Sequence, residues 1–113
     1  PFISANLGSN SWTRQDRNMV FSRLIFRVHA IKRMHQRNIQ EEVVRDALGN
    51  GETIEDYPDD TPYPSRLVLG WHGSRPIHVV VADNADDQVS IVITTYEPNP
   101  SEWENDFKRR KNP

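Results

Sequence analysis

Alternating and apolar stretches separated by short polar turns occupy residues 66–96, and this pattern constrains the fold more than any other feature of the chain. Period-two alternation is typical of half-buried strands, and turns of Gly, Ser, Pro, Asn and Asp join such strands into hairpins. A shorter strand is expected before a proline-rich loop at 58–64, where three prolines remove ladder donors. The expected strands are 53–57, 66–72, 77–82 and 89–96, which predict a meander of about four antiparallel strands.

Helical spacing of apolar residues flanks this meander. Residues 29–36 predict a short helix with Ala30, Ile31 and Met34 inward, and residues 40–48 predict a second helix. Asn38 between them suits a left-handed helix end. Residues 102–110 predict a C-terminal helix that places Trp103 and Phe107 against the sheet. The predicted fold class is therefore α+β, with two N-terminal helices, a roughly four-stranded antiparallel sheet and a C-terminal helix.

Length and composition predict one domain. Of the 113 residues, 19–113 are expected to form it, and 1–18 are expected to be disordered or vector-derived because they are rich in Ser and Asn and lack apolar periodicity. The chain has no cysteine, which excludes disulfides, thiolate nucleophiles and cysteine zinc sites. No apolar run approaches the roughly 20 residues that span a bilayer. We expect a cytoplasmic protein without a membrane partner.

The net charge of −2 conceals an uneven distribution. Residues 1–37 contain seven bases and one acid, whereas residues 38–107 contain three bases and fifteen acids. Four further bases follow in residues 108–111. A basic face of this kind could hold a phosphate chain, although the overall pI of about 6.1 argues against strong general nucleic-acid binding.

Two histidines in this setting form the candidate site. On the first predicted helix His29, Arg33 and either Gln36 or Arg37 share one stripe, at spacings of four and seven or eight residues. Arg33 and Arg37 could bind phosphates. Histidine is the side chain whose ordinary pKa lies nearest neutrality, so a second histidine that converged on His29 could act with it as acid and base.

Alternation in the predicted strands places His78, Thr94 and Tyr96 in one polar cluster. Metal-free RNA cleavage needs a base for the 2′-hydroxyl, an acid for the leaving oxygen and a cation for the phosphorane charge. We therefore predict His29, His78 and Tyr96 as catalytic residues. The predicted substrate-binding residues are Arg33, Arg37 and Thr94.

Alternative roles for these residues remain open. Both histidines could be hydrogen-bonded scaffold residues, because perturbed or paired titratable groups are often structural. The acids Asp56, Asp59 and Asp60 lack calcium-loop spacing, and His72 with His78 fits no known zinc-ligand spacing. We predict no metal and no cofactor.

Four segments in order carry a family resemblance. They are 28–34 with 37–39, 44–48 with 50–51, 76–80, and 93–98 with Trp103. This series resembles the bacterial family called domain of unknown function 4258 over nearly all of 26–110, with Asn38 where the family commonly has Gly. That family is similar to RelE/ParE-like toxins, which implies a RelE-like α+β fold and an endoribonuclease or a toxin paired with an antitoxin. The resemblance picks out His29, Arg33, Arg37, His78 and Tyr96.

Three functions follow as hypotheses. The first is a metal-independent RNA endonuclease of toxin type, with RNA as substrate and an antitoxin as partner. The second is a non-catalytic module that binds another protein through its acidic middle or a sheet edge. The third is a small-molecule or metal-binding protein.

Overall fold

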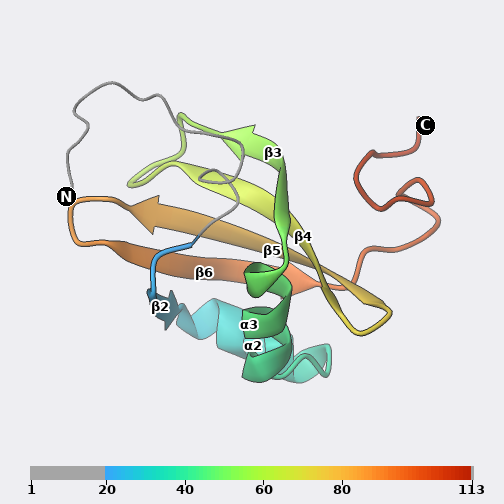
Figure 1. Cartoon of the computed structure of the whole chain (residues 1–113), viewed down its shortest axis with the longest axis horizontal. Coiled ribbons are helices and arrows are strands. Elements are labelled where there is room, and N and C mark those ends of the chain that lie inside the picture. The colour runs from blue at the N-terminus through green and yellow to red at the C-terminus, as the bar shows by residue number, and fades with distance from the viewer. Residues whose placement is uncertain (1–19, 113) are drawn as a thin grey trace.

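The computed structural model describes residues 20–112, which form one five-stranded sheet with two helices on one side (Figure 1). The prediction for residues 1–18 lies outside this range. The elements in chain order are β2 Arg23–Phe26, α2 Val28–Gln36, α3 Glu41–Gly49, β3 Glu52–Tyr57, β4 Ser65–His72, β5 Arg75–Asn84 and β6 Val89–Tyr96. Neither helix is long and apolar enough to cross a membrane.

The strand order is β2-β6-β5-β4-β3, and the sheet is mixed. The meander from β3 to β6 is antiparallel as predicted, but β2 adds a fifth strand that pairs in parallel with β6. The predicted four-stranded antiparallel sheet is therefore wrong. Leu24 and Phe26 alternate toward the core, so this short extended segment can join the sheet. The meander has β3 at one edge and β6 at the other, and β2 pairs with the edge formed by β6.

One face of the sheet and the two helices enclose the main core. From the helices it includes Ala30, Met34 and the apolar stripe of α3. From the sheet it includes the alternate residues Ile77, Val79 and Val81 of β5, with Val68 of β4 and Val92 of β6. Burying such a stripe provides most of the stability of helices this short. Ile31 is an exception to the prediction, because it points outward and is 53% exposed.

The end of α2 confirms the role predicted for Asn38. Its φ is 55°, in the left-handed region that asparagine tolerates. The Ile39 amide then donates to the Met34 carbonyl at 2.9 Å and the Asn38 amide to that of His35 at 3.4 Å, which is the Schellman pattern. Ile39 is buried, so this turn fixes the direction in which α3 leaves.

The C-terminal residues form no helix, which corrects the prediction for 102–110. Residues 98–112, called here the C-terminal strap, form turns closed by an antiparallel bridge between Trp103 and Arg110. Phe107 has φ 59°, a conformation that no right-handed helix contains. Asp106 accepts a hydrogen bond from the Lys108 amide at 2.9 Å, and such local side-chain bonds favour turns over helix. The expected RelE-like arrangement is thus wrong in its sheet and in its third helix.

Candidate functional site

Two of the six predicted site residues lie on α2 and a third, Arg37, is its C-cap, all on the side of the helix that faces solvent and the edge of β6. His29, Arg33 and Arg37, called here the basic flank, are all exposed. Arg33 contacts only Gln36 of its own helix, at 3.4 Å. His29 and Arg33 therefore lie on one stripe, as their spacing predicted. Of the two alternatives for its third member, Arg37 contacts the sheet.

Arg37 joins the basic flank to β6. Its Nη1 donates to the Thr95 carbonyl at 2.8 Å and lies 3.5 Å from Thr94 Oγ1. This part of β6 has an open edge, because β2 pairs only as far as Val92. Arg37 thus satisfies an edge carbonyl and brings the predicted substrate-binding residues Arg37 and Thr94 together.

His78 lies on the opposite face of the sheet from α2. Its neighbours Ile77 and Val79 belong to the core beneath the helices, so strand alternation turns His78 away from them. Its side chain is fully buried. The structure therefore does not bring His29 and His78 together, although it pairs His78 with Tyr96, the residue opposite it on β6.

Both ring nitrogens of His78 have partners. Nε2 lies 2.8 Å from the Phe107 carbonyl, which can only accept, so this nitrogen carries a proton. Nδ1 lies 3.3 Å from the Tyr96 hydroxyl, which can donate to it. Burial lowers the pKa of His78 below its ordinary value of 6.5, and burial likewise raises the pKa of Tyr96. At neutral pH the pair is therefore uncharged.

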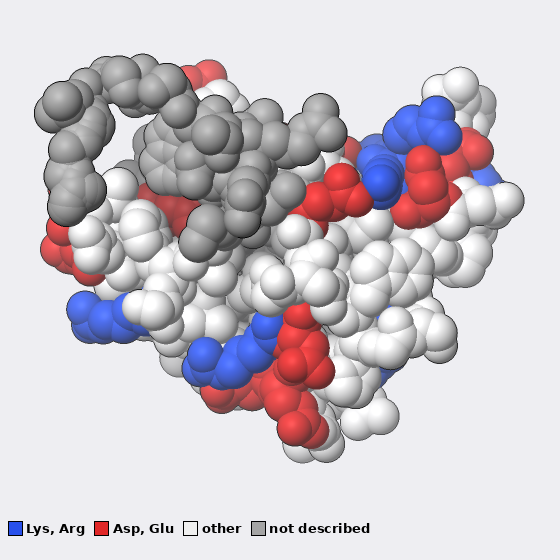
Figure 2. Space-filling view, viewed as in Figure 1, with Lys and Arg blue, Asp and Glu red and all other residues white. Residues whose placement is uncertain are grey.

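The C-terminal strap covers His78. The Trp103 ring meets the imidazole edge-on, with centroids 4.4 Å apart, and Arg110 stacks on Trp103 at 4.5 Å. Lys108 pairs with Glu52 at 2.8 Å and Arg110 with Glu55 at 3.4 Å, which ties the strap to β3. Basic and acidic side chains consequently lie interleaved there, at the upper right of Figure 2. The sequence placed Trp103 against the sheet but gave no sign that it covers His78.

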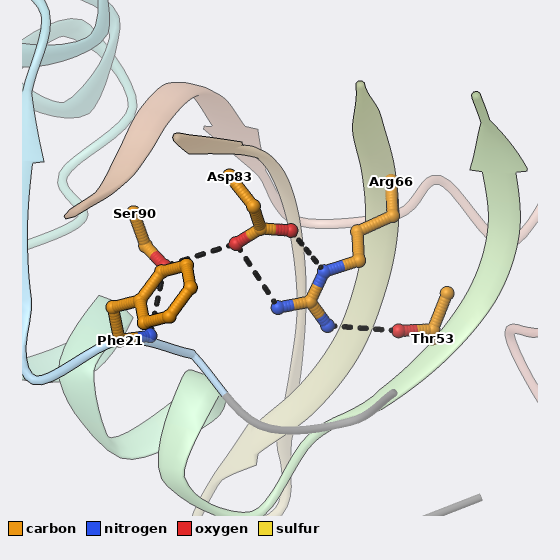
Figure 3. Close-up of polar contacts among 5 residues, drawn as sticks. All are labelled: Phe21, Thr53, Arg66, Asp83 and Ser90. Atoms are coloured by element: carbon orange, nitrogen blue, oxygen red, sulfur yellow. Dashed lines mark hydrogen bonds and ion pairs between the residues drawn. The ribbon is translucent and has the colours of Figure 1, made fainter. Parts of the chain in front are cut away.

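A second polar cluster, missed by the sequence analysis, links four strands (Figure 3). Arg66 of β4 pairs with Asp83 of β5 at 2.9 Å and donates to Thr53 of β3 at 3.0 Å. Ser90 of β6 donates to Asp83 at 3.0 Å and accepts from the Phe21 amide at 2.9 Å. Arg66 is only 7% exposed. The sequence carried a signal for this burial, because strand alternation places Arg66 on the same face as Val68, which belongs to the core.

Positive charge without counterions distinguishes the β2–α2 part of the described chain. Residues 20–40 contain no acid, and their five bases form no ion pair with any carboxylate of residues 20–112. These bases are Arg23, Arg27, Lys32, Arg33 and Arg37. By contrast, every Lys and Arg of residues 41–110 is ion-paired, and outside residues 20–40 only Lys111 of the described chain has no ion pair. The paired cations are Arg45, Arg66, Arg75, Lys108, Arg109 and Arg110.

Metal ligands do not gather among residues 20–112, where no group of three or more His, Asp and Glu could hold an ion. His72 pairs with Asp46 at 3.0 Å. The absence of a metal from the predicted site residues stays a prediction, as do the roles assigned to them.

Comparison with curated proteins finds no match, and comparison with solved structures finds none either. One family model matches residues 26–97, from the end of β2 to just after β6. The match contains all six predicted site residues and stops before the C-terminal strap. Because it covers more than half of the chain, the protein belongs to the family described as domain of unknown function (DUF4258).

Proposed function

We propose that this protein binds RNA through phosphate contacts made by the basic flank and its neighbouring cations on α2. The observation that carries the proposal is the set of five bases in residues 20–40 that no carboxylate of the described chain neutralises. When unpaired cations of this kind neutralise phosphates, the nucleic acid releases its condensed counterions, and this release drives binding.

The spacing of the basic flank suits contacts along one strand of RNA. Arg33 and Arg37 are one turn apart, which corresponds to about 6 Å along the helix axis. Phosphates two nucleotides apart on one strand are about 6.8 Å apart along the axis of a helical strand, so Arg33 and Arg37 can each contact one of them. Thr94 places a hydroxyl beside Arg37, and the His29 ring is exposed and able to stack on a base.

The acidic remainder of the chain is compatible with this proposal. Acids outnumber bases fifteen to three in residues 38–107, so other faces repel a phosphate chain. Binding is then confined to one surface, and it should weaken steeply with salt even though the whole protein is slightly acidic.

Metal-independent cleavage of the bound RNA, as in a toxin-type endonuclease, is the finer form of the proposal. Its support is that His29 is exposed next to the predicted phosphate-binding arginines, where a general acid or base must lie. His78 is a poor candidate for direct proton transfer in this conformation, because Trp103 and Phe107 cover it. Tyr96 would act only if its hydroxyl exchanged His78 for the substrate.

Fluorescence anisotropy with a labelled single-stranded RNA tests binding. Arg33→Gln should lower the affinity several-fold and reduce the slope of log affinity against log salt by about 0.7, the value for one phosphate contact. Arg109→Gln is the matched control, since it removes a guanidinium that is also exposed but is already paired with Asp106. Equal effects of the two variants, or no binding by the wild type at low salt, would refute the proposal.

Cleavage is tested with the same RNA in chelator, read on a gel. His29→Ala should abolish cleavage and His35→Ala should not, because both histidines are exposed on α2 but only His29 belongs to the basic flank. Intact RNA after incubation with the wild type would reject the nuclease and leave RNA binding standing.

A further inference from the structure

The outer side of α2 carries an exposed aliphatic pair. Val28 is 69% exposed and Ile31 is 53% exposed, although the helix already buries Ala30 and Met34. Single exposed apolar residues are ordinary, but these two are three positions apart and so adjoin on one side of the helix. We call Val28 and Ile31 the aliphatic pair.

The aliphatic pair is separate from the basic flank. Each residue turns the helix by about 100°, so Ile31 and Arg33 project roughly 200° apart. Aliphatic side chains gain nothing from phosphate, which is hydrated and charged. The proposed RNA surface therefore leaves these two side chains unexplained.

Unpaired cations frame the aliphatic pair. Arg27 immediately precedes Val28, and Lys32 follows Ile31 and lies one turn after Val28. Neither cation is paired with a carboxylate among residues 20–112. A complementary ligand therefore has an apolar strip bordered by negative charge.

We propose that an acidic amphipathic helix of a partner protein docks along α2, with its apolar strip on Val28 and Ile31 and its carboxylates on Arg27 and Lys32. A helix fits because the spacing of the aliphatic pair matches the ridges by which helices pack side by side. This surface shares the cations Arg27 and Lys32 with the basic region of the proposed RNA site, but its aliphatic contact is one that RNA does not use, and its partner is a protein.

A second copy of the described chain does not meet these requirements. A two-fold pairing of α2 with α2 sets Arg27 and Lys32 against their own counterparts, which is repulsive. The other helix, α3, has acids in its first turn, but its apolar stripe is buried against the sheet. The partner must therefore supply both the apolar strip and the carboxylates.

The probe is a labelled synthetic helix of about 20 residues, with leucines on one face and glutamates elsewhere, titrated with the full chain by fluorescence anisotropy. The wild type should bind it, and should bind at least about tenfold more weakly both a scrambled peptide and one with lysine for glutamate. Failure to bind the probe, or equal binding of the acidic and basic peptides, would overturn the proposal.

Variants locate the contact. Ile31→Ser should weaken binding of the acidic peptide about tenfold or more, and Lys32→Glu should weaken it and reduce its salt dependence. Ile25→Ser is the matched control, because Ile25 is 43% exposed but alternates with the core-facing residues of β2 and so points to the other face. Equal losses for Ile31→Ser and Ile25→Ser would overturn the proposal.

Two further measurements separate the competing occupants. Light scattering should show a monomer. A dimer that Ile31→Ser dissociates would instead assign the aliphatic pair to contact with a second copy and overturn the proposal. RNA binding should be unchanged in Ile31→Ser, and a loss of RNA affinity equal to that of Arg33→Gln would assign this side of α2 to RNA and overturn the proposal.

Discussion

Replacing Gly70 with alanine tests the contact between β4 and α3. A Cβ on Gly70 would lie 1.8 Å from the Ala47 carbonyl oxygen, against about 3.4 Å for an ordinary contact. The obstacle is helix backbone, so no side-chain rotation relieves it, and α3 must move about 1.6 Å away. A gap of even 0.5–1 Å forfeits roughly a quarter to a half of the dispersion attraction across an interface. The four buried side chains of α3 would all be affected.

We expect Gly70→Ala to lower the free energy of unfolding by about 3–5 kcal/mol, comparable to a large core truncation. With a urea slope of about 2 kcal/mol/M, the midpoint falls by roughly 2 M. Urea unfolding followed by circular dichroism measures this. Gly49→Ala is the control, because nothing lies within 4 Å of its Cβ, and it should be neutral or slightly stabilising. A Gly70→Ala midpoint within about 0.3 M of the wild type would refute the reasoning.

Three further perturbations test the polar groups and the strap. Burial lowers the pKa of His78, so on acidification the unfolded chain binds a proton near pH 6.5 before the folded chain does. The free energy of unfolding should therefore fall from pH 7.5 to 5.5, by at most about 1.4 kcal/mol per pH unit. Urea unfolding at several pH values should show a smaller pH dependence of this free energy in His78→Gln but not in His35→Gln. Arg66→Met should cost about 3 kcal/mol because it leaves Asp83 without its guanidinium, and Arg66→Met/Asp83→Asn should recover part of this loss in the same unfolding assay. Trp103→Ala should expose the C-terminal strap to limited proteolysis, whereas unchanged cleavage rates would show that the strap is held without the indole.

Local sequence signals predicted most of the elements. The turn at 73–76 and the apolar alternation around it placed the β4–β5 hairpin, and its register is continuous from Ser65 to His72. Asn38 ended α2 because left-handed conformations are cheap for asparagine, and this property depends only on the residue itself. The membership of the DUF4258 family was also legible in the chain, since short motifs in order carry it.

Within the candidate site, spacing alone aligned His29, Arg33 and Arg37, because helical periodicity is a local property. Spacing does not show which face of the sheet α2 covers, so it could not predict that His29 and His78 lie apart. The exposed aliphatic pair was hidden for a similar reason. Apolar spacing predicted that Ile31 points inward, and only packing against β6 shows that Ala30 and Met34 form the buried side.

The sequence by itself determined which segments are helix or strand between residues 28 and 96, and where positive charge is concentrated. The tertiary structure alone decided that β2 runs parallel beside β6, that the C-terminal residues become a strap over His78, and that Arg66 pairs with Asp83. Each of these depends on partners distant in sequence. Their free energy comes from burial and pairing that exist only after the sheet has formed, so no local pattern encodes them.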